Sequence, residues 1–259
     1  MGCDLLAVTA WRVDADRMDE FESADDVVAH MASLQAQTIT SALPADRAAA
    51  VERRVSRTVP AEALVDSSAD AELVVIGPRS ANVIDGLLLG SVAETVVSKA
   101  ICPVVVVHDA TLERSNRIVV GVDGTACSRQ ALDWALRQAA LTSSRVEAIW
   151  AWQWRAEYGV YPYGPDDATL EARTKARLEA VLSSLDAEQA ALVDGRVTPG
   201  PAARVLLDAS AGADLLVVGN HRAGPLTERL LGSVSQKVVR HAQVPVVVVH
   251  ESISDPAEM

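Results

Sequence analysis

One segment of the chain occurs twice. Residues 72–108, the first copy, realign onto residues 214–250, the second copy, with a constant offset of 142 and 18 of 37 pairs identical. The identities fall on an apolar strand pattern, a Gly-Ser pair, a helix stripe and a Pro-Val-Val-Val-Val-His ending. Solenoid repeats have periods of roughly 20–50 residues, whereas this period is that of a small domain. The 259 residues therefore predict a tandem duplication.

Strand and helix patterns alternate through the second half of the chain. Arg117–Asp123 is a continuous apolar run, which is typical of a strand buried on both faces. Residues 128–141 carry apolar residues at helical spacing. This alternation predicts right-handed β-α-β units and a parallel sheet. Further strands are predicted at 146–154, 196–198, 214–219 and 244–250, and further helices at 168–185, 202–211 and 233–242.

The first half is shorter at its front. Leu5–Trp11 matches Val146–Trp152 at an offset of 141, so it corresponds to the second strand of a unit. The counterpart of residues 117–140, a strand and a helix, is absent from the first half. We expect a gap or a rearranged sheet edge there. Two explanations stay open, a decayed duplicate and a chain given from an internal methionine, and we favour the second.

The last helix of each copy is predicted to begin with a capping box. Ser91 is followed three residues later by Glu94, and Ser233 by Gln236. In such a box the hydroxyl accepts a hydrogen bond from a first-turn amide while the longer side chain reaches back. We therefore expect helices to begin at residues 91 and 233.

Charge and composition disfavour some classes of partner. The net charge is −12 and no Lys/Arg run forms a stripe along the chain, so nucleic acid is not an expected partner. The apolar runs Ile101–Val107 and Val244–Val249 fall short of the ~20 residues of a membrane span, so no membrane is expected. Cys3, Cys102 and Cys127 lack CxxC spacing and indicate reduced, small apolar residues in a cytoplasmic protein.

An anion site is predicted where the second copy's strand ends and its helix begins. Gly219 ends a buried strand, and Gly232-Ser233 opens a helix whose free amides attract anions. Asp123 follows another strand at the same sheet edge and suits a ribose hydroxyl or an adenine amino group. The alternative, that these residues only end a strand and cap a helix, stays open. The chain has no P-loop motif.

Five stretches carry a resemblance: VGVDGTACSRQALDWA, GLLLGSVAETVV, RLLGSVSQKVV and the endings CPVVVVH and VPVVVVH. Together they resemble the universal stress protein family, over nearly the whole chain. The resemblance implies an α/β fold of two tandem, Rossmann-like domains, each with a five-stranded parallel sheet, the first incomplete at its N-terminus. The expected domains are residues 1–110 and 115–252, followed by a tail at 253–259.

The resemblance also implies an ATP site in the second domain. The family motif is an Asp after the first strand and a G-x2-G-x9-G-[S/T] loop, and Arg222 stands where the middle glycine belongs. The guanidinium of Arg222 can itself pair with phosphate, as can His221. The first copy has Ser80 at the middle position and no first-strand Asp, so no ATP site is expected there. The expected nucleotide-binding residues are Gly121, Val122, Asp123, Ala151, Gly219, His221, Arg222, Gly232, Ser233, Val234 and Ser235.

Family members also pair through their last strands. We therefore expect Val104–Val107 to pair antiparallel with Val246–Val249 within the chain, which buries an otherwise exposed edge. A homodimer stays open. His108 and His250 end these strands at equivalent positions, which indicates a shared structural role rather than a metal site.

The expected function is that of a cytoplasmic stress-response sensor or regulator that binds ATP, with or without Mg²⁺, and turns it over slowly or not at all. One alternative is an interaction module of the same fold that binds no nucleotide. A further alternative is an enzyme that uses adenine nucleotides, although the loops show no poised set of acid, base and nucleophile.

Overall fold

A computed structural model describes residues 4–11, 23–77, 89–108, 114–153, 166–220 and 231–250. Its chain divides into two compact units, Met1–Ala69 and Asp70–Met259, called here the small unit and the large unit. Each unit is described by itself.

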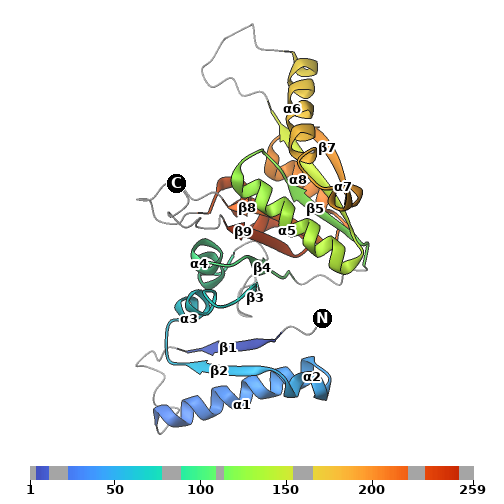
Figure 1. The fold of residues 1–259 in the computed structure, drawn as a ribbon. Helices are drawn as coiled ribbons and strands as arrows, with labels where there is room; N and C mark the ends of the chain where they lie inside the picture. Colours follow the sequence, from blue (N-terminus) through green and yellow to red (C-terminus); the bar gives the residue numbers. More distant parts are fainter. Residues whose placement is uncertain are drawn as a thin grey trace, which may run out of the picture. The chain divides into compact units, whose positions relative to one another are not determined.

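The small unit is a parallel strand pair with three helices (blue in Figure 1). Gln35 on its first helix is buried, and its side-chain amide donates to the carbonyl of Ala7, at 2.9 Å, and to the hydroxyl of Thr9, at 2.8 Å. These bonds fasten the helix to the first strand. The elements are β1 (Leu6–Ala10), α1 (Ala24–Ala42), α2 (Ala45–Ala49), β2 (Glu52–Ser56) and α3 (Pro60–Ser67).

The large unit contains a seven-stranded sheet in the order β3-β4-β9-β8-β5-β6-β7. Neighbouring strands are parallel except β4 and β9, which are antiparallel. The strands are β3 (Val74–Ile76), β4 (Val104–Val106), β5 (Arg117–Gly121), β6 (Arg145–Trp152), β7 (Val193–Pro199), β8 (Leu215–Asn220) and β9 (Val246–His250). The helices are α4 (Ser91–Lys99), α5 (Ala126–Thr142), α6 (Asp167–Leu182), α7 (Ala187–Leu192), α8 (Ala202–Ser210) and α9 (Ser233–His241).

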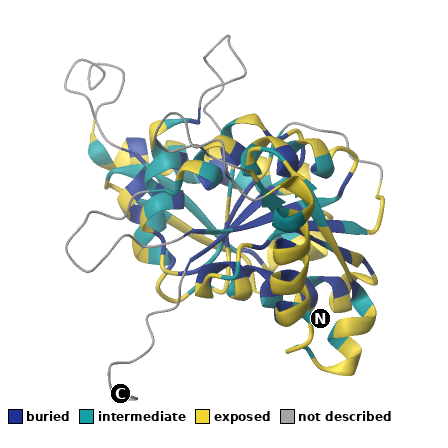
Figure 2. Cartoon of the chain, turned by 90° about the horizontal axis from the view of Figure 1, so that it is seen from above, coloured by how far each residue is buried: buried dark blue, intermediate teal, exposed yellow. Residues whose placement is uncertain are grey.

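Helices cover both faces of this sheet. Ile118 and Val120 of β5 join one core cluster with α5, α6, β6, β8 and β9. Gly121 of the same strand faces the other way, where an added Cβ would lie 2.9 Å from Cδ1 of Leu206 on α8. Since side chains alternate along a strand, α5 and α8 lie on opposite faces. The buried residues, dark blue in Figure 2, include the greater part of these strands.

The two Val-rich strands, β4 and β9, lie side by side within the sheet. Val104 of β4 is opposite Val248 of β9, and Val106 is opposite Val246, in antiparallel register. All four side chains are buried. The sequence predicted this antiparallel pairing of strands.

The predicted capping boxes are wrong, although both helices begin at the predicted residues. Ser91 and Ser233 are the first helical residues, the N-caps are Gly90 and Gly232, and neither helix has a side-chain cap. The side chains of Glu94 and Gln236 do not reach back to the cap, because they contact each other at 3.4 Å. The sequence also missed α7, whose cap is a capping box between Asp186 and Gln189.

The division into compact units does not follow the repeat. Elements β1 and β2 form a separate two-stranded sheet, whereas β3 and β4 belong to the sheet of the large unit. In the second half of the chain, β5 lies between β6 and β8 and joins the two corresponding strand pairs. No counterpart of β5 is present among the described residues of the first half, so its two strand pairs are not joined into one sheet.

Candidate functional site

A pocket of about 120 Å³ lies at the carboxyl ends of β5 and β8 in the large unit. This edge of a parallel sheet is where doubly wound folds bind ligands. Seven of the expected site residues line it: Gly121, Val122, Asp123, Ala151, Gly219, Val234 and Ser235. Gly232 and Ser233 directly precede Val234 but do not line the pocket, and His221 and Arg222 lie outside the described residues.

Other lining residues were not found from the sequence. Thr125, Cys127 and Ser128 come from the turn and first turn of helix after β5, while Ala202 and Leu206 come from α8. Ile149 and Val218 complete the wall. The strand-to-helix pattern could have indicated Thr125, Cys127 and Ser128, since they lie in the turn and first helical turn that follow Asp123. The α8 residues have no such signal, because only the fold brings α8 to this edge.

Asp123 is held in a defined turn. Its Oδ1 accepts from the backbone N–H of Thr125, at 3.0 Å, and from the hydroxyl of Thr125, at 2.6 Å. Thr125 is the N-cap of α5 and accepts from the N–H of Ser128, at 3.2 Å. Gly124 between them has φ +81°, a left-handed conformation that favours glycine. The turn therefore fixes the carboxylate at the pocket wall before any ligand arrives.

Gly219 is required for packing. A Cβ at this position would lie 2.7 Å from the carbonyl oxygen of Cys127, which is backbone of α5 and cannot move aside. The contact lets β8 approach the first turn of α5 closely. Gly219 thus has a structural reason to be glycine besides the expected approach of a phosphate.

Two hydrogen bonds tie the end of β8 to the start of α9. Asn220 is buried, and its Oδ1 accepts from the N–H of Gly232 at 3.0 Å. The hydroxyl of Ser235 donates to the carbonyl of Gly219 at 2.9 Å. These two bonds hold the end of β8 and the start of α9 together on one side of the pocket. Asn220 was missed from the sequence, because an asparagine at a strand end is an ordinary turn residue.

The first turn of α9 faces the pocket with Val234 and Ser235. Its N-cap, Gly232, has no side chain to cap it, so the first-turn N–H groups have no side-chain acceptor among the residues that the structure describes. The positive end of the helix dipole adds to these donors. This geometry suits a phosphate or another anion.

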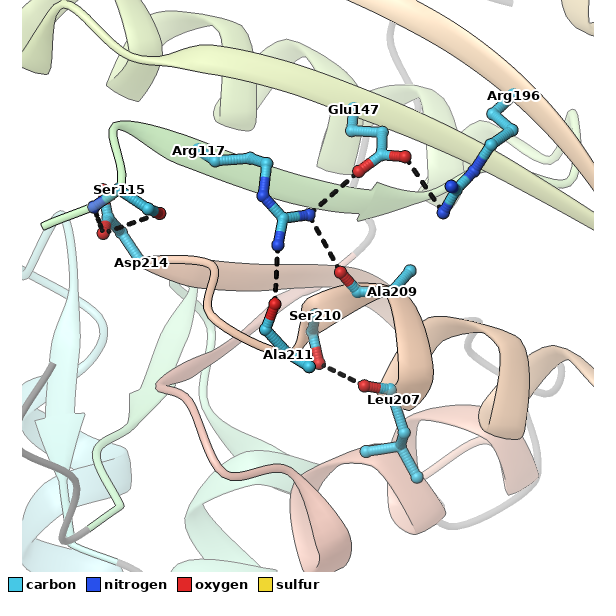
Figure 3. A network of polar contacts seen from close by, with 9 residues as sticks. All are labelled: Ser115, Arg117, Glu147, Arg196, Leu207, Ala209, Ser210, Ala211 and Asp214. Atoms are coloured by element: carbon cyan, nitrogen blue, oxygen red, sulfur yellow. Dashed lines mark hydrogen bonds and ion pairs between the residues drawn. The ribbon is translucent and has the colours of Figure 1, made fainter. Parts of the chain in front are cut away.

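Helix α8, which supplies Ala202 and Leu206, is anchored at its other end by Arg117 (Figure 3). The guanidinium donates to the carbonyls of Ala209, at 2.9 Å, and Ala211, at 2.7 Å. These are carbonyls at the C-terminal end of α8, which lack helical partners. The anchor fixes the position of α8 against the sheet and so the shape of the pocket wall.

A larger groove of about 710 Å³ lies beside this anchor. Three arginines face it, but Glu147 bridges two of them, with its oxygens 3.0 Å from Arg117 and 3.0 Å from Arg196 (Figure 3). The third, Arg204, lies 3.7 Å from Asp208. The positive charge that would recruit an anion here is therefore largely compensated. In the described part of the chain, no group of three His, Cys, Asp or Glu side chains could hold a metal ion.

None of the helices that the structure describes is long and apolar enough to cross a membrane.

The chain is similar to known proteins. The model of the universal stress protein family matches residues 1–108 and 115–250. A universal stress protein of Mycobacterium tuberculosis is 34% identical over 216 residues, which are 82% of this chain and 72% of that protein.

The fold is shared with a solved structure. A universal stress protein from Archaeoglobus fulgidus has a TM-score of 0.65 at 19% identity, covering 95% of this chain and 88% of that one. A universal stress protein in complex with cAMP, at 27% identity, covers 52% of this chain and 96% of its own, with a TM-score of 0.41. With two matched segments that together span nearly the whole sequence, the chain belongs to the universal stress protein family.

Proposed function

We propose that the large unit binds an adenine nucleotide, ATP with or without Mg²⁺, in the pocket at the ends of β5 and β8. One observation carries the proposal: the same pocket is lined by the carboxylate residue Asp123 and by Val234 and Ser235 of the first turn of α9. A carboxylate accepts from ribose or adenine, and uncapped helix amides donate to phosphate. The two kinds of group thus match the two ends of a nucleotide.

The roles follow from these positions. Asp123 accepts from a ribose hydroxyl or the adenine amino group, Val122 and Ala151 pack against the base, and the amides of residues 233–235 donate to phosphate. The described walls enclose about 120 Å³, below the roughly 300–1,000 Å³ of ordinary ligand pockets, so they hold part of the nucleotide. From the sequence we assign further phosphate contacts to His221 and Arg222.

The proposal extends to the setting of the protein. The chain acts in the cytoplasm as a stress-response sensor or regulator, through nucleotide binding and not through turnover. Its domains are residues 1–110 and 115–252. The two domains pair with each other through β4 of the first and β9 of the second, and a homodimer is a further assembly. The antiparallel register of these strands supports the pairing.

A second candidate function is an interaction module that binds no nucleotide. Three expected site residues have partners or packing reasons within the chain: Gly219 packs on Cys127, the N–H of Gly232 bonds Asn220, and the hydroxyl of Ser235 bonds Gly219. These contacts hold the fold together without a ligand.

The test is ATP binding by calorimetry, after measurement of the nucleotide carried by the freshly purified protein. Asp123→Ala removes an ionised hydrogen-bond partner, so we expect the Kd for ATP to rise roughly 10- to 150-fold. Asp123→Asn keeps an acceptor for Thr125 and removes only the charge and one ligand acceptor. It should fold like the wild type and still bind ATP more weakly.

The matched control is Asp186→Ala, which removes another aspartate that accepts from a backbone N–H, at the cap of α7. We expect about 1 kcal/mol of lost stability and an unchanged Kd for ATP. A wild-type protein that carries no nucleotide and ignores added ATP would leave the interaction module as the function. Phosphate release at enzyme-like rates would favour an enzyme instead.

A further inference from the structure

Helix α9, which presents the proposed phosphate-binding amides, is held by two side chains of the first copy, His108 and Glu94. The Nε2 of His108, at the end of β4, lies 3.0 Å from the carbonyl oxygen of Val239 on α9. Oε1 of Glu94 on α4 accepts from Arg240 at 3.0 Å and from Gln236 at 3.4 Å. The first copy thus holds the C-terminal two turns of α9.

The same tie exists in the opposite direction. The Nε2 of His250, at the end of β9, lies 2.7 Å from the carbonyl oxygen of Val97 on α4. His250 and Val97 are the equivalents of His108 and Val239 at the offset of 142. The antiparallel pairing of β4 and β9 relates the two copies by an approximate two-fold axis. Each copy therefore holds the last helix of the other.

The two sets of contacts hold different helices, α9 in one case and α4 in the other. At its N-terminal end α9 lines the pocket with Val234 and Ser235, opposite the turn of Asp123. For α4, no residue in the described part of the chain takes the place of Asp123, because no counterpart of β5 is found among the described residues of the first half. Only the tie on α9 leads to a candidate ligand site.

We propose that His108 and Glu94 are positioning residues for the phosphate-binding end of α9. A helix of nine residues is a short rod, so fixing its second half fixes the direction of its first-turn amides. Asn220 and Ser235 fix the other end from within the second copy. The first copy thus serves the nucleotide site of the second copy without touching the ligand.

The imidazole of His108 contributes as a donor. Its Nε2–H faces the carbonyl of Val239, one of the last carbonyls of a helix that ends at His241. Such carbonyls lack helical partners, and a donor there also meets the negative end of the helix dipole. Glu94 adds an ion pair to Arg240 with half-exposed side chains, so its share is the smaller one.

The experiment compares His108→Ala with His250→Ala. These variants remove equivalent side chains from the same seam, and only the first tie ends on α9. Hydrogen exchange is measured without nucleotide at the first hydrogen-bonded amide of each helix. These amides are Gln236, whose N–H donates to the carbonyl of Gly232, and its equivalent Glu94, whose N–H donates to the carbonyl of Gly90. The Kd for ATP is measured separately. For His108→Ala we expect faster exchange at Gln236 and a Kd roughly 3- to 10-fold higher. For His250→Ala we expect faster exchange at Glu94 and a Kd within about twofold of wild type.

Glu94→Gln is the second variant. It keeps an acceptor of the same shape, so the fold is retained, and it gives the first copy the residue that the second copy carries at 236. We expect the same direction of change as for His108→Ala, with a smaller amplitude. Equal losses of ATP affinity in the two histidine variants, or unchanged exchange at the amide of Gln236 in His108→Ala, would overturn the proposal.

The inference rests on the proposed function only for the identity of the ligand. If the wild type binds no ATP, the proposed function fails, but the exchange rates still decide whether His108 positions α9. If ATP binds and the exchange of the Gln236 amide is the same in His108→Ala and the wild type, the positioning role fails and the nucleotide site stands.

Discussion

The two copies have similar sequences and similar local structure, yet the pocket at the ends of β5 and β8 is lined by described residues of the second copy and by none of the first. Gly219 of the second copy packs on the backbone of α5, with Cys127 O 2.7 Å from an added Cβ. Its equivalent, Gly77, has no atom of the described residues within 4 Å of an added Cβ. The helices that follow begin alike, after Gly90 and Gly232, and neither has a side-chain cap. The difference between the copies arises outside the repeated segment.

Burial shows the same difference. Val217 of β8 is fully buried, whereas its equivalent Val75 of β3 is 58% exposed. Val249 and Val107 differ likewise, at 5% and 40% exposed. Val217 and Val249 belong to the core cluster formed with α5. In the second half of the chain, α5 covers these side chains and the end of β5 leads to the carboxylate of Asp123. The repeated strand, loop and helix are therefore only part of a site.

The largest expected contrast is in the core. Val217→Ala leaves a cavity under α5 and should lower the free energy of unfolding of the large unit by about 2–3 kcal/mol. Val75→Ala removes an exposed side chain and should change it by less than about 0.5 kcal/mol. Urea unfolding followed by tryptophan fluorescence measures both. Equal losses would mean that Val75 is covered as well as Val217 and would remove the basis of the comparison.

A smaller contrast is expected at the matched glycines. Gly219→Ala forces a methyl group against the carbonyl of Cys127 and should cost about 1–3 kcal/mol, together with weaker ATP binding. Gly77→Ala places its methyl group in open space and should leave both quantities unchanged. Thermal unfolding and calorimetry are the measurements. If Gly219→Ala has wild-type stability, β8 and the first turn of α5 leave room for a methyl group, and the packing role of Gly219 is contradicted.

The smallest contrast concerns the turn before the paired strands, where Cys102 stands in the first copy and Val244 in the second. Burial raises the pKa of the Cys102 thiol. A raised pKa in the folded state means that the protein loses stability as pH rises through that pKa, and keeps it in full below the thiol's unfolded value of about 8.5. Cys102→Val, the second copy's residue, should therefore make stability less dependent on pH above that value.

Chemical unfolding at pH 7 and pH 9.5 measures this effect. The backbone carbonyl of residue 102, which lies 3.1 Å from Nδ1 of His250, is unchanged by the substitution. Stability at pH 7 should accordingly stay near that of the wild type. If the wild type and Cys102→Val lose the same free energy of unfolding between pH 7 and pH 9.5, the effect assigned to Cys102 is contradicted.

Much of the fold could be predicted from the sequence, because the apolar patterns are strong. Helices beginning at Ser91 and Ser233 were predicted from the residues at their starts, and the antiparallel pairing of the Val-rich strands from the family resemblance; both are present. The capping boxes were wrong, since Glu94 and Gln236 are equivalent residues that meet across the seam. A local motif could not reveal a partner 142 residues away. The short helix α7 was missed for lack of a long apolar stripe.

The candidate site divides in the same way. Asp123, Gly219 and the start of α9 were predicted from strand ends and a Gly-Ser pair, and the pocket brings Asp123, Gly219 and Val234 together. The sequence by itself determined the duplication, the alternation of strands and helices and the sheet edge that carries the pocket, because these depend on patterns within short windows. Tertiary structure decided what surrounds each copy: α5 over β8 but not over β3, Asn220 on Gly232, and His108 on Val239. Such contacts join distant residues, and their energy depends on the fold that brings those residues together.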